Sequence, residues 1–246
     1  MTKAEIDYVT PQWPAPLHVR ALTTLRLGGS SQGAYQGLNL AEHVGDDFAH
    51  VTKNRRLMQT SIGCPSDPNW LEQVHGSQVI QLDDSDVSRV ADGSMSRCRG
   101  VVCAVLSADC VPLFLTDKSG QFVALLHVGW RWLEAGIVES GLDLIREPMG
   151  QILAWLGPSI GPAVYEVRDD VRARLVTACR DHDSNFTKTE TGWLADLPGM
   201  VEQRLRRAGV EAVGSSGLCT FSGPYNWFSH RRSAPCGRMA SLIWLA

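Results

Sequence analysis

The chain has 246 residues, enough to bury a substantial hydrophobic core without disulfide or metal support. Its formal net charge is -3 at pH 7, so it lacks the basic footprint of a nucleic-acid-binding protein or a polybasic membrane-associated protein. No apolar run is long enough to span a bilayer, and the first residues contain no signal-peptide-like segment, so we expect a cytoplasmic protein.

The seven cysteines are spread along the chain and form no C-x-x-C pair. An odd, scattered set argues against both a disulfide framework and a zinc ribbon, so we expect reduced thiols. No linker, repeat or low-complexity stretch divides the chain. We therefore expect a single catalytic domain over residues 1–246.

The first third of the chain alternates between extended and helical patterns. Residues 18–27 and 70–82 are extended in character. Between them, apolar residues recur at helical spacing over 47–62, after acidic residues at the start, which predicts a helix there.

The central block is rich in strands. The apolar run 101–106 predicts a buried strand, and 112–115 and 122–127 predict two more. The segment 117–120, Asp-Lys-Ser-Gly, is typical of the tight turn of a hairpin, so we expect the last two strands to pair.

Helices and strands continue to the end of the chain. Apolar spacing predicts a helix from Leu133 to Glu147, stopped by Pro148. Further predictions are a strand over 152–156, a rigid loop over 156–162, helices over 171–178 and 197–205, and a final strand over 239–245. Neighbouring antiparallel strands mixed with helices indicate an α+β layered fold rather than a doubly wound parallel sheet.

Three residues stand where an apolar run meets a glycine-, proline- or polar-containing segment: His75, Cys110 and His127. Strand ends are rigid points from which side chains can converge. If the three meet, two histidines and one cysteine suit zinc with an open fourth position, as in a catalytic site. Without a metal, Cys110 and a histidine would form the nucleophile and base of a cysteine hydrolase. The alternative for each histidine is a hydrogen-bonded residue of the core, and for the cysteine a small hydrophobic core residue, in each case with no role in chemistry.

Two neighbours of these residues are further candidates. Arg131 follows the segment that ends at His127, at the expected start of a helix, where a bound anion such as phosphate would explain a cation. A surface salt bridge explains it equally well. Asp109, beside Cys110, is a candidate catalytic or supporting carboxylate, or a cap.

Ordered segments along nearly the whole chain resemble the YfiH family of purine nucleoside phosphorylases, formerly called laccase-domain or polyphenol oxidase proteins. The matching segments are T-x-R-x-G-G-S at 24–30, Asn39-Leu40, V-G-D-D at 44–47, Asn54-Arg55, Q-V-H-G at 73–76, C-A-V-L-S-A-D-C at 103–110, H-V-G-W-R at 127–131, L-G-P-S-I-G-P at 156–162, Cys219-Thr220, and S-H-R-R followed by G-R-M-A-S.

The resemblance implies an α-β-β-α sandwich with mixed sheets, similar to a cysteine-hydrolase-like fold. It implies that His75, Cys110 and His127 bind zinc, with copper as the second metal. It also implies phosphorolysis of adenosine, inosine, guanosine and methylthioadenosine, and deamination of adenosine. The expected partners are therefore a nucleoside and phosphate, with neither nucleic acid nor a membrane.

Phosphorolysis requires cations that place phosphate against the sugar, a role for which we consider Arg131, Arg26 and Arg55. One departure from the family pattern matters, because the family usually has glycine after H-A-G-W-R and this chain has Trp132 there. This departure bears on the shape of the pocket and on the start of the helix.

Two other functions compete with this one, and a third is excluded. Bacterial members of the family also resemble amidases that remove a misincorporated serine from a UDP-muramyl precursor in peptidoglycan editing. A non-catalytic metal-binding regulatory module is the second of these rivals. A true laccase is excluded, because a blue-copper centre and a trinuclear cluster together need more histidines than the seven in this chain allow.

Overall fold

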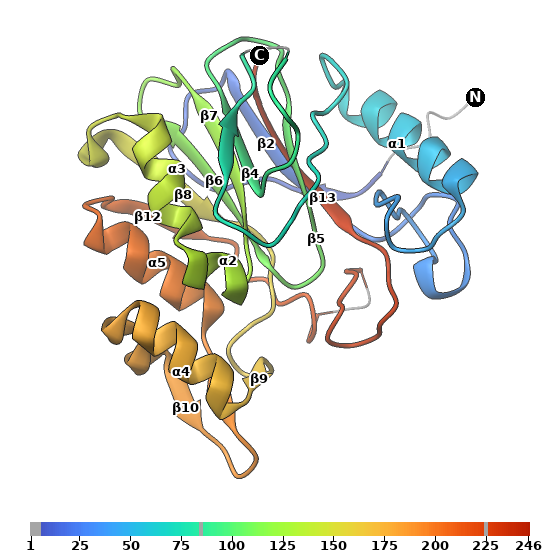
Figure 1. The fold of residues 1–246 in the computed structure, drawn as a ribbon. Helices are drawn as coiled ribbons and strands as arrows, with labels where there is room; N and C mark the ends of the chain where they lie inside the picture. Colours follow the sequence, from blue (N-terminus) through green and yellow to red (C-terminus); the bar gives the residue numbers. More distant parts are fainter. Residues whose placement is uncertain (1–5, 84–85, 224–225) are drawn as a thin grey trace.

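Two β-sheets face each other and helices cover their outer faces (Figure 1). These layers are seen in a computed structural model of the chain, which describes residues 6–83, 86–223 and 226–246. The order of layers is helix, sheet, sheet, helix. This arrangement confirms the expected α-β-β-α sandwich with mixed sheets.

The larger sheet has six strands in the order β12-β8-β6-β7-β4-β3. The central pairs are antiparallel, whereas the two edge pairs, β12 with β8 and β3 with β4, are parallel. Both faces of the central strands are covered, which explains their unbroken apolar runs. The bounds are β3 (Val79–Gln81), β4 (Gly93–Ser96), β6 (Val111–Asp117), β7 (Val123–Val128), β8 (Ile152–Leu156) and β12 (Ala212–Ser215).

The smaller sheet is antiparallel, in the order β1-β2-β13-β5. The last strand of the chain lies in its middle and pairs with both neighbours, so residues far apart in sequence meet here. The bounds are β1 (Tyr8–Val9), β2 (Val19–Thr24), β5 (Cys103–Ser107) and β13 (Met239–Leu245).

The space between the sheets is filled by buried apolar side chains. Phe114 of β6 and Trp155 of β8 pack edge to face, with ring centroids 5.4 Å apart, against Val105 and Ile243 of the facing sheet. Burying a side chain of this size contributes roughly 1.5–3 kcal/mol. The strand ends that carry the candidate site are therefore held by a rigid core.

Helix α1 (Phe48–Ile62) covers the smaller sheet, with Met58 fully buried against it. It begins where the sequence predicts, because the Asp47 side chain accepts a hydrogen bond from Ala49 N and caps the first turn. It ends at Gly63, which adopts the left-handed conformation.

The larger sheet is covered by α3 (Ile137–Ile145) and α5 (Leu197–Arg207), with α2 (Trp130–Ala135) and α4 (Asp169–Ala178) beside them (Figure 1). The prediction of one helix from Leu133 to Glu147 is wrong. Gly136 has φ +86°, a conformation that glycine adopts readily, and it divides the segment into α2 and α3.

A small third sheet and three 3₁₀ turns complete the described chain. The sheet lies beside α4 and has the order β10-β11-β9. Its strands are β9 (Glu166–Val167), β10 (Phe186–Lys188) and β11 (Trp193–Ala195), and the turns are Gly33–Tyr35, Met149–Gln151 and Arg180–Asn185. The sequence predicts none of these short elements, because each is fixed by its neighbours rather than by a pattern of its own.

The predicted hairpin, with β6 paired to β7 through the turn at 117–120, is confirmed. The expected extended segment 70–82 is mostly loop, and only β3 within it is a strand. All seven cysteines are free, as expected. In the described parts of the chain, no helix is long and apolar enough to cross a membrane.

Candidate functional site

Cys110 lies where the chain passes from one sheet to the other, between β5 and β6. The preceding residue, Asp109, has φ +93°, an uncommon conformation for a non-glycine residue. Hydrogen bonds hold Asp109 in this conformation. Its carbonyl accepts one from Ile160 N at 2.8 Å, and its carboxylate accepts one from the Thr220 hydroxyl and one from Arg231 N, both at 2.7 Å. Both carboxylate oxygens are thus occupied, which makes Asp109 an anchor for the turn that presents Cys110.

His127 comes from β7, opposite Pro112 of β6 in the register. It is 5% exposed, and its Nδ1 atom is buried without a hydrogen-bond partner in the described structure. Burial lowers the pKa of His127 to about 4, against the opposing influence of the Asp92 carboxylate. The imidazole is therefore neutral at physiological pH and offers a lone pair.

His75 lies on the loop before β3, with φ +65°. The Asp92 carboxylate accepts the backbone N–H groups of His75 at 3.1 Å and Gly76 at 2.7 Å, while the Asp92 carbonyl accepts His127 N at 2.9 Å. The Gln73 side chain fastens the same loop to β5 by pairing with the backbone N–H and C=O of Leu106. Asp92 thus fixes the two histidines relative to each other.

The indole of Trp132 packs against the side chains of the candidate ligands. Its ring centroid lies 4.4 Å from that of His75 and 4.5 Å from that of His127. A Cβ placed on Gly129 would stand 2.5 Å from the indole and 2.8 Å from the Cys110 sulfur, so this glycine lies against both side chains. The three candidate side chains therefore share one neighbourhood around Trp132, although His75 reaches it from a loop and not from a strand end as expected.

The donor set suits a metal, but the arrangement does not. Two imidazoles and a thiol are ligands that zinc or copper accepts. Yet among the described residues no three His, Cys, Asp or Glu side chains converge closely enough to hold an ion. With the indole packed against both imidazole rings, the three side chains do not fit a metal ion in this conformation.

Arginine charges surround the same neighbourhood. Burial, followed by the Asp109 carboxylate, raises the pKa of the Cys110 thiol to about 12, while the charges of Arg238 and Arg131 act in the opposite direction. Burial likewise raises the pKa of Tyr165, opposed by Arg231 and Arg131. Three guanidinium groups therefore contribute positive potential around Cys110 and Tyr165.

Arg131 is exposed in the first turn of α2, with its guanidinium 4.4 Å from the centre of the Trp130 ring. It forms no salt bridge within the described part of the chain, unlike Arg174, which stacks on the same ring and pairs with Glu134. The predicted alternative of a surface salt bridge thus finds no support. Since α2 has only six residues, its dipole is too short to bind an anion alone.

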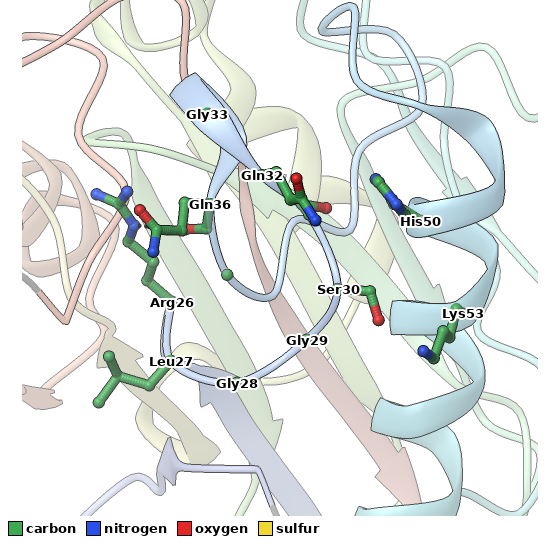
Figure 2. A pocket seen from close by; sticks show the side chains of 12 residues that line it. Arg26, Leu27, Gly28, Gly29, Ser30, Gln32, Gly33, Gln36, His50 and Lys53 are labelled. Atoms are coloured by element: carbon green, nitrogen blue, oxygen red, sulfur yellow. Dashed lines mark hydrogen bonds between the residues drawn. The ribbon is translucent and has the colours of Figure 1, made fainter.

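The other two candidate phosphate ligands lie elsewhere. Arg26 stacks over Phe228 and lines a cavity of about 1100 Å³, together with His50 and Lys53 (Figure 2). Arg55 on α1 pairs with Glu42 at 2.8 Å and lies over the Trp70 ring. No contact in the described structure joins either arginine to His75, Cys110 or His127.

Sequence reasoning missed several residues that build this site: Asp92, Tyr165, Arg231 and Arg238. Asp92 has no motif that singles it out. Thr220 and Arg231 reach Asp109 from more than a hundred residues away, and their only signal was that they belong to short matching segments near the end of the chain.

Residues 20–246 match the model of a family described as multi-copper polyphenol oxidoreductase laccase. The chain is 44% identical over 240 residues to a purine nucleoside phosphorylase of Pseudomonas aeruginosa, covering 97% of this chain and 98% of the relative. It is 41% identical over 238 residues to purine nucleoside phosphorylase YfiH of Escherichia coli, covering 96% and 98%.

Solved structures with the same fold include a Neisseria meningitidis protein of the family DUF152, with a TM-score of 0.92 and 38% identity over 97% of this chain and 98% of that one. YlmD from Geobacillus stearothermophilus has a TM-score of 0.84 and 29% identity over 98% of both chains. The similarity therefore extends over the entire sandwich.

Proposed function

The chain belongs to the multi-copper polyphenol oxidoreductase laccase family, and we propose that within this family it is an enzyme that cleaves purine nucleosides with phosphate. The proposal is supported by the names of its relatives. It also agrees with the chemistry of the site, which combines two imidazoles and a thiol with a set of arginine charges.

The observation that carries the proposal is a set of arginine charges: Arg131 and Arg238 act on the Cys110 thiol, Arg131 and Arg231 act on Tyr165, and the Arg231 guanidinium lies 4.9 Å from the centre of the Tyr165 ring. Phosphate at neutral pH carries between one and two negative charges and binds best where several cations face it. Arg131 is the arginine best suited to bind it, since its guanidinium is exposed and has no carboxylate partner in the described structure.

In phosphorolysis, a phosphate oxygen forms a bond to the sugar C1′ while the bond from C1′ to the purine nitrogen breaks. The electron pair of that bond leaves with the purine, which takes up a proton, and ribose 1-phosphate is the second product. Arg131 would hold the phosphate and balance its charge as it approaches the sugar. Asp109 acts as a positioning residue, because both of its oxygens are occupied by Thr220 and Arg231.

The proposal includes the finer expectations from the family resemblance: adenosine, inosine, guanosine and methylthioadenosine as substrates, and deamination of adenosine. It also retains His75, Cys110 and His127 as ligands of zinc, or of copper. Because these three side chains do not fit an ion in the conformation described here, no step of the mechanism is assigned to a metal.

The test is a product assay on purified protein with each nucleoside, in the presence and absence of inorganic phosphate. We expect free purine to appear only with phosphate, together with an equal amount of ribose 1-phosphate. Purine release that is independent of phosphate, or the absence of turnover with every nucleoside, would refute the proposal.

The rival function of an amidase for a UDP-muramyl peptide needs a thiol paired with a base. In the described structure, no hydrogen bond joins the Cys110 sulfur to His75 or His127, and the indole of Trp132 packs against both histidines. The same assay should therefore include the muramyl precursor that carries serine. Release of serine without any nucleoside turnover would favour the amidase.

A further inference from the structure

The cavity of about 1100 Å³ shown in Figure 2 lies between helix α1 and the loop of residues 26–37. None of His75, Cys110 and His127 is among the residues that line it. Sites for small molecules usually enclose roughly 300–1,000 Å³, so the cavity has room for a ligand of nucleotide size. Part of its lining is the T-x-R-x-G-G-S segment at 24–30, whose residues take no part in the reaction proposed above.

The lining of the cavity carries cationic groups and, among the described residues, no carboxylate. Arg26, Lys53 and the imidazole of His50 stand among glycine, serine, glutamine and leucine residues. Within the described parts of the chain, neither Arg26 nor Lys53 forms a salt bridge. The Asp46 carboxylate accepts a hydrogen bond from the Ser31 hydroxyl at 2.6 Å but does not line the cavity. Cations without acidic partners give a cavity a positive potential that attracts anions.

The loop that forms one wall is fastened to α1 by the side chain of Asn54, which is fully buried. Its side-chain oxygen accepts the backbone N–H of Ser30 at 2.7 Å. Its side-chain nitrogen donates to the Ser31 hydroxyl and to the Asn39 carbonyl, both at 2.9 Å. The wall is therefore fixed before any ligand arrives, which lowers the entropic cost of binding.

The Arg26 side chain is also held in place. Its Nε donates to the Gln36 carbonyl at 2.9 Å, and its guanidinium lies 5.0 Å from the centre of the Phe228 ring. The two Nη atoms make no hydrogen bond within the described structure, so they are available to a ligand. Beside Arg26 the main chain is open, because a Cβ placed on Gly28, which has φ +81°, would meet no atom within 4 Å.

The cations stand on two sides of the loop: Figure 2 shows Arg26 with Gln36 on one side, and His50 with Lys53 on α1 on the other. An arginine fork matches the oxygens of a phosphate group, and serine and glutamine side chains add hydrogen bonds. We infer from this arrangement that the cavity binds an oligophosphate chain, inorganic or attached to a nucleoside, with phosphates held by Arg26 and Lys53 at opposite ends. This inference does not depend on the cleavage of nucleosides.

The test is calorimetric titration of the purified protein with tripolyphosphate, ATP and orthophosphate, at low ionic strength and without magnesium. One tripolyphosphate should bind per chain, about tenfold more tightly than orthophosphate, which is too short to reach both groups of cations. Equal affinities for ATP and tripolyphosphate would show that the chain alone is recognised, and tighter binding of ATP would assign the site to a nucleotide. Absence of binding by both would overturn the inference.

Lys53→Glu should weaken tripolyphosphate binding about tenfold or more, because it puts an anion at one end of the cavity. The matched control is Lys118→Glu, which makes the same change of charge at a lysine that donates to the Gly150 carbonyl and does not line the cavity. Arg131→Lys should leave the affinity for tripolyphosphate unchanged. Binding that is weakened by Arg131→Lys and unaffected by Lys53→Glu would place the anion beside Cys110 and overturn the inference.

A second measurement uses only the unmodified protein. Lys53 is exposed, so an amine-reactive reagent labels it, and peptide mass spectrometry gives its rate of labelling beside that of Lys118. Saturating tripolyphosphate should slow the labelling of Lys53 and leave that of Lys118 unchanged. If Lys53 is labelled equally fast with and without bound tripolyphosphate, the inference is wrong, even where Lys53→Glu fails to fold.

Discussion

The Asp92 carboxylate accepts the backbone N–H of His75 at 3.1 Å. The same carboxylate holds Gly76 at 2.7 Å, and the Asp92 carbonyl accepts His127 N at 2.9 Å, so one buried residue ties a loop to a central strand. Because this link determines where the two imidazoles lie, it is a sensitive point of the site.

Asp92→Ala should lower the free energy of unfolding by about 2–3 kcal/mol, since two backbone donors lose a charged acceptor. It should also lower nucleoside turnover more than stability alone explains. Asp92→Asn keeps one acceptor oxygen. Its free energy of unfolding, measured with urea, should lie between those of the unmodified protein and Asp92→Ala. An Asp92→Ala protein with unchanged nucleoside turnover would show that turnover does not depend on the position of the His75 loop.

Arg131→Lys should raise the KM for phosphate roughly tenfold, because lysine keeps the charge but loses the planar fork. The proposed deamination of adenosine, which would use no phosphate, should change far less. Arg174→Lys is the matched control, since Arg174 stacks on the same Trp130 ring but is paired with Glu134. Equal loss of both activities in Arg131→Lys would point to a structural role.

Cys219 should be the thiol that reacts fastest with iodoacetamide near pH 7. Burial raises its pKa, but hydrogen bonds to its sulfur from the backbone of Ser222 and Gly161 outweigh that effect and leave the pKa below the ordinary value. The exposed Cys98 has a pKa raised by the Asp83 carboxylate. Peptide mass spectrometry gives the order of labelling, with Cys219→Ser as the control, and faster labelling of Cys98 would contradict it.

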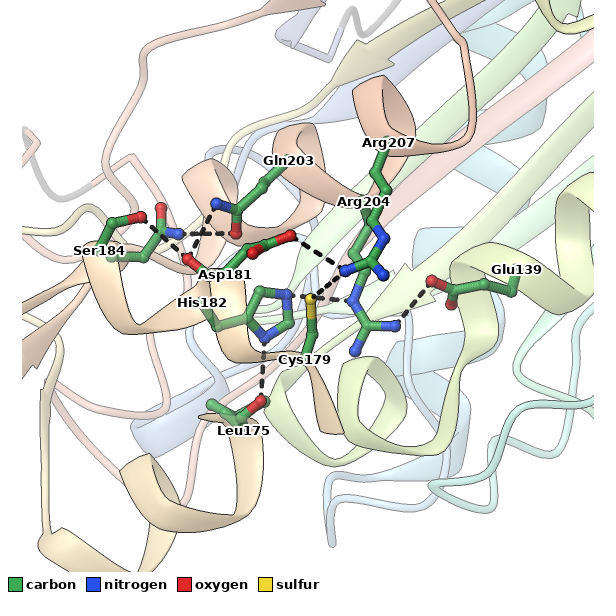
Figure 3. Close-up of polar contacts among 10 residues, drawn as sticks. Glu139, Leu175, Cys179, Asp181, His182, Ser184, Gln203, Arg204 and Arg207 are labelled. Atoms are coloured by element: carbon green, nitrogen blue, oxygen red, sulfur yellow. Dashed lines mark hydrogen bonds and ion pairs between the residues drawn. The ribbon is translucent and has the colours of Figure 1, made fainter. Parts of the chain in front are cut away.

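His182 should make the protein less stable in acid. It is fully buried, accepts a hydrogen bond from Arg204 at Nε2 and contacts the Leu175 carbonyl through Nδ1, while Arg204 pairs with Glu139 (Figure 3). Burial first, and the Arg204 charge second, lower the pKa of His182 to about 4.

The unfolded chain binds a proton on this histidine near pH 6.5, whereas the folded protein does so only near pH 4. Stability is therefore fully present above pH 6.5 and falls as the pH drops toward 4, by up to about 3 kcal/mol from this residue. Urea unfolding of His182→Gln should show a smaller loss over that range. If the free energy of unfolding depended on pH identically in both proteins, His182 would not be the cause of the loss of stability in acid.

The sequence predicted those parts of the fold that rest on local patterns. The hairpin of β6 and β7 and the last strand β13 are apolar runs bounded by turns, and α1 has its cap at Asp47. The break at Gly136 was not predicted, because a single glycine is tolerated within a helical pattern and only the left-handed backbone shows that the helix ends there.

The residue types of the candidate site were predicted from the sequence, and their role stays a prediction, whereas their geometry was not predicted. The sequence grouped His75, Cys110 and His127 by expected strand ends and by the family resemblance, and the structure places all three around one indole, with His75 on a loop. The sequence showed that Trp132 was unusual, but not that it would pack against both histidines. The contact between Thr220 and Asp109 joins residues 111 positions apart, for which local spacing contains no signal.

The central claim, that phosphate rather than water attacks the sugar, is tested most directly by following inosine turnover with ³¹P NMR. We expect the ribose 1-phosphate signal to grow in equal amount to the hypoxanthine released, and both to fall together in Arg131→Lys at limiting phosphate. Hypoxanthine release accompanied by free ribose, with no ribose 1-phosphate, would contradict the account.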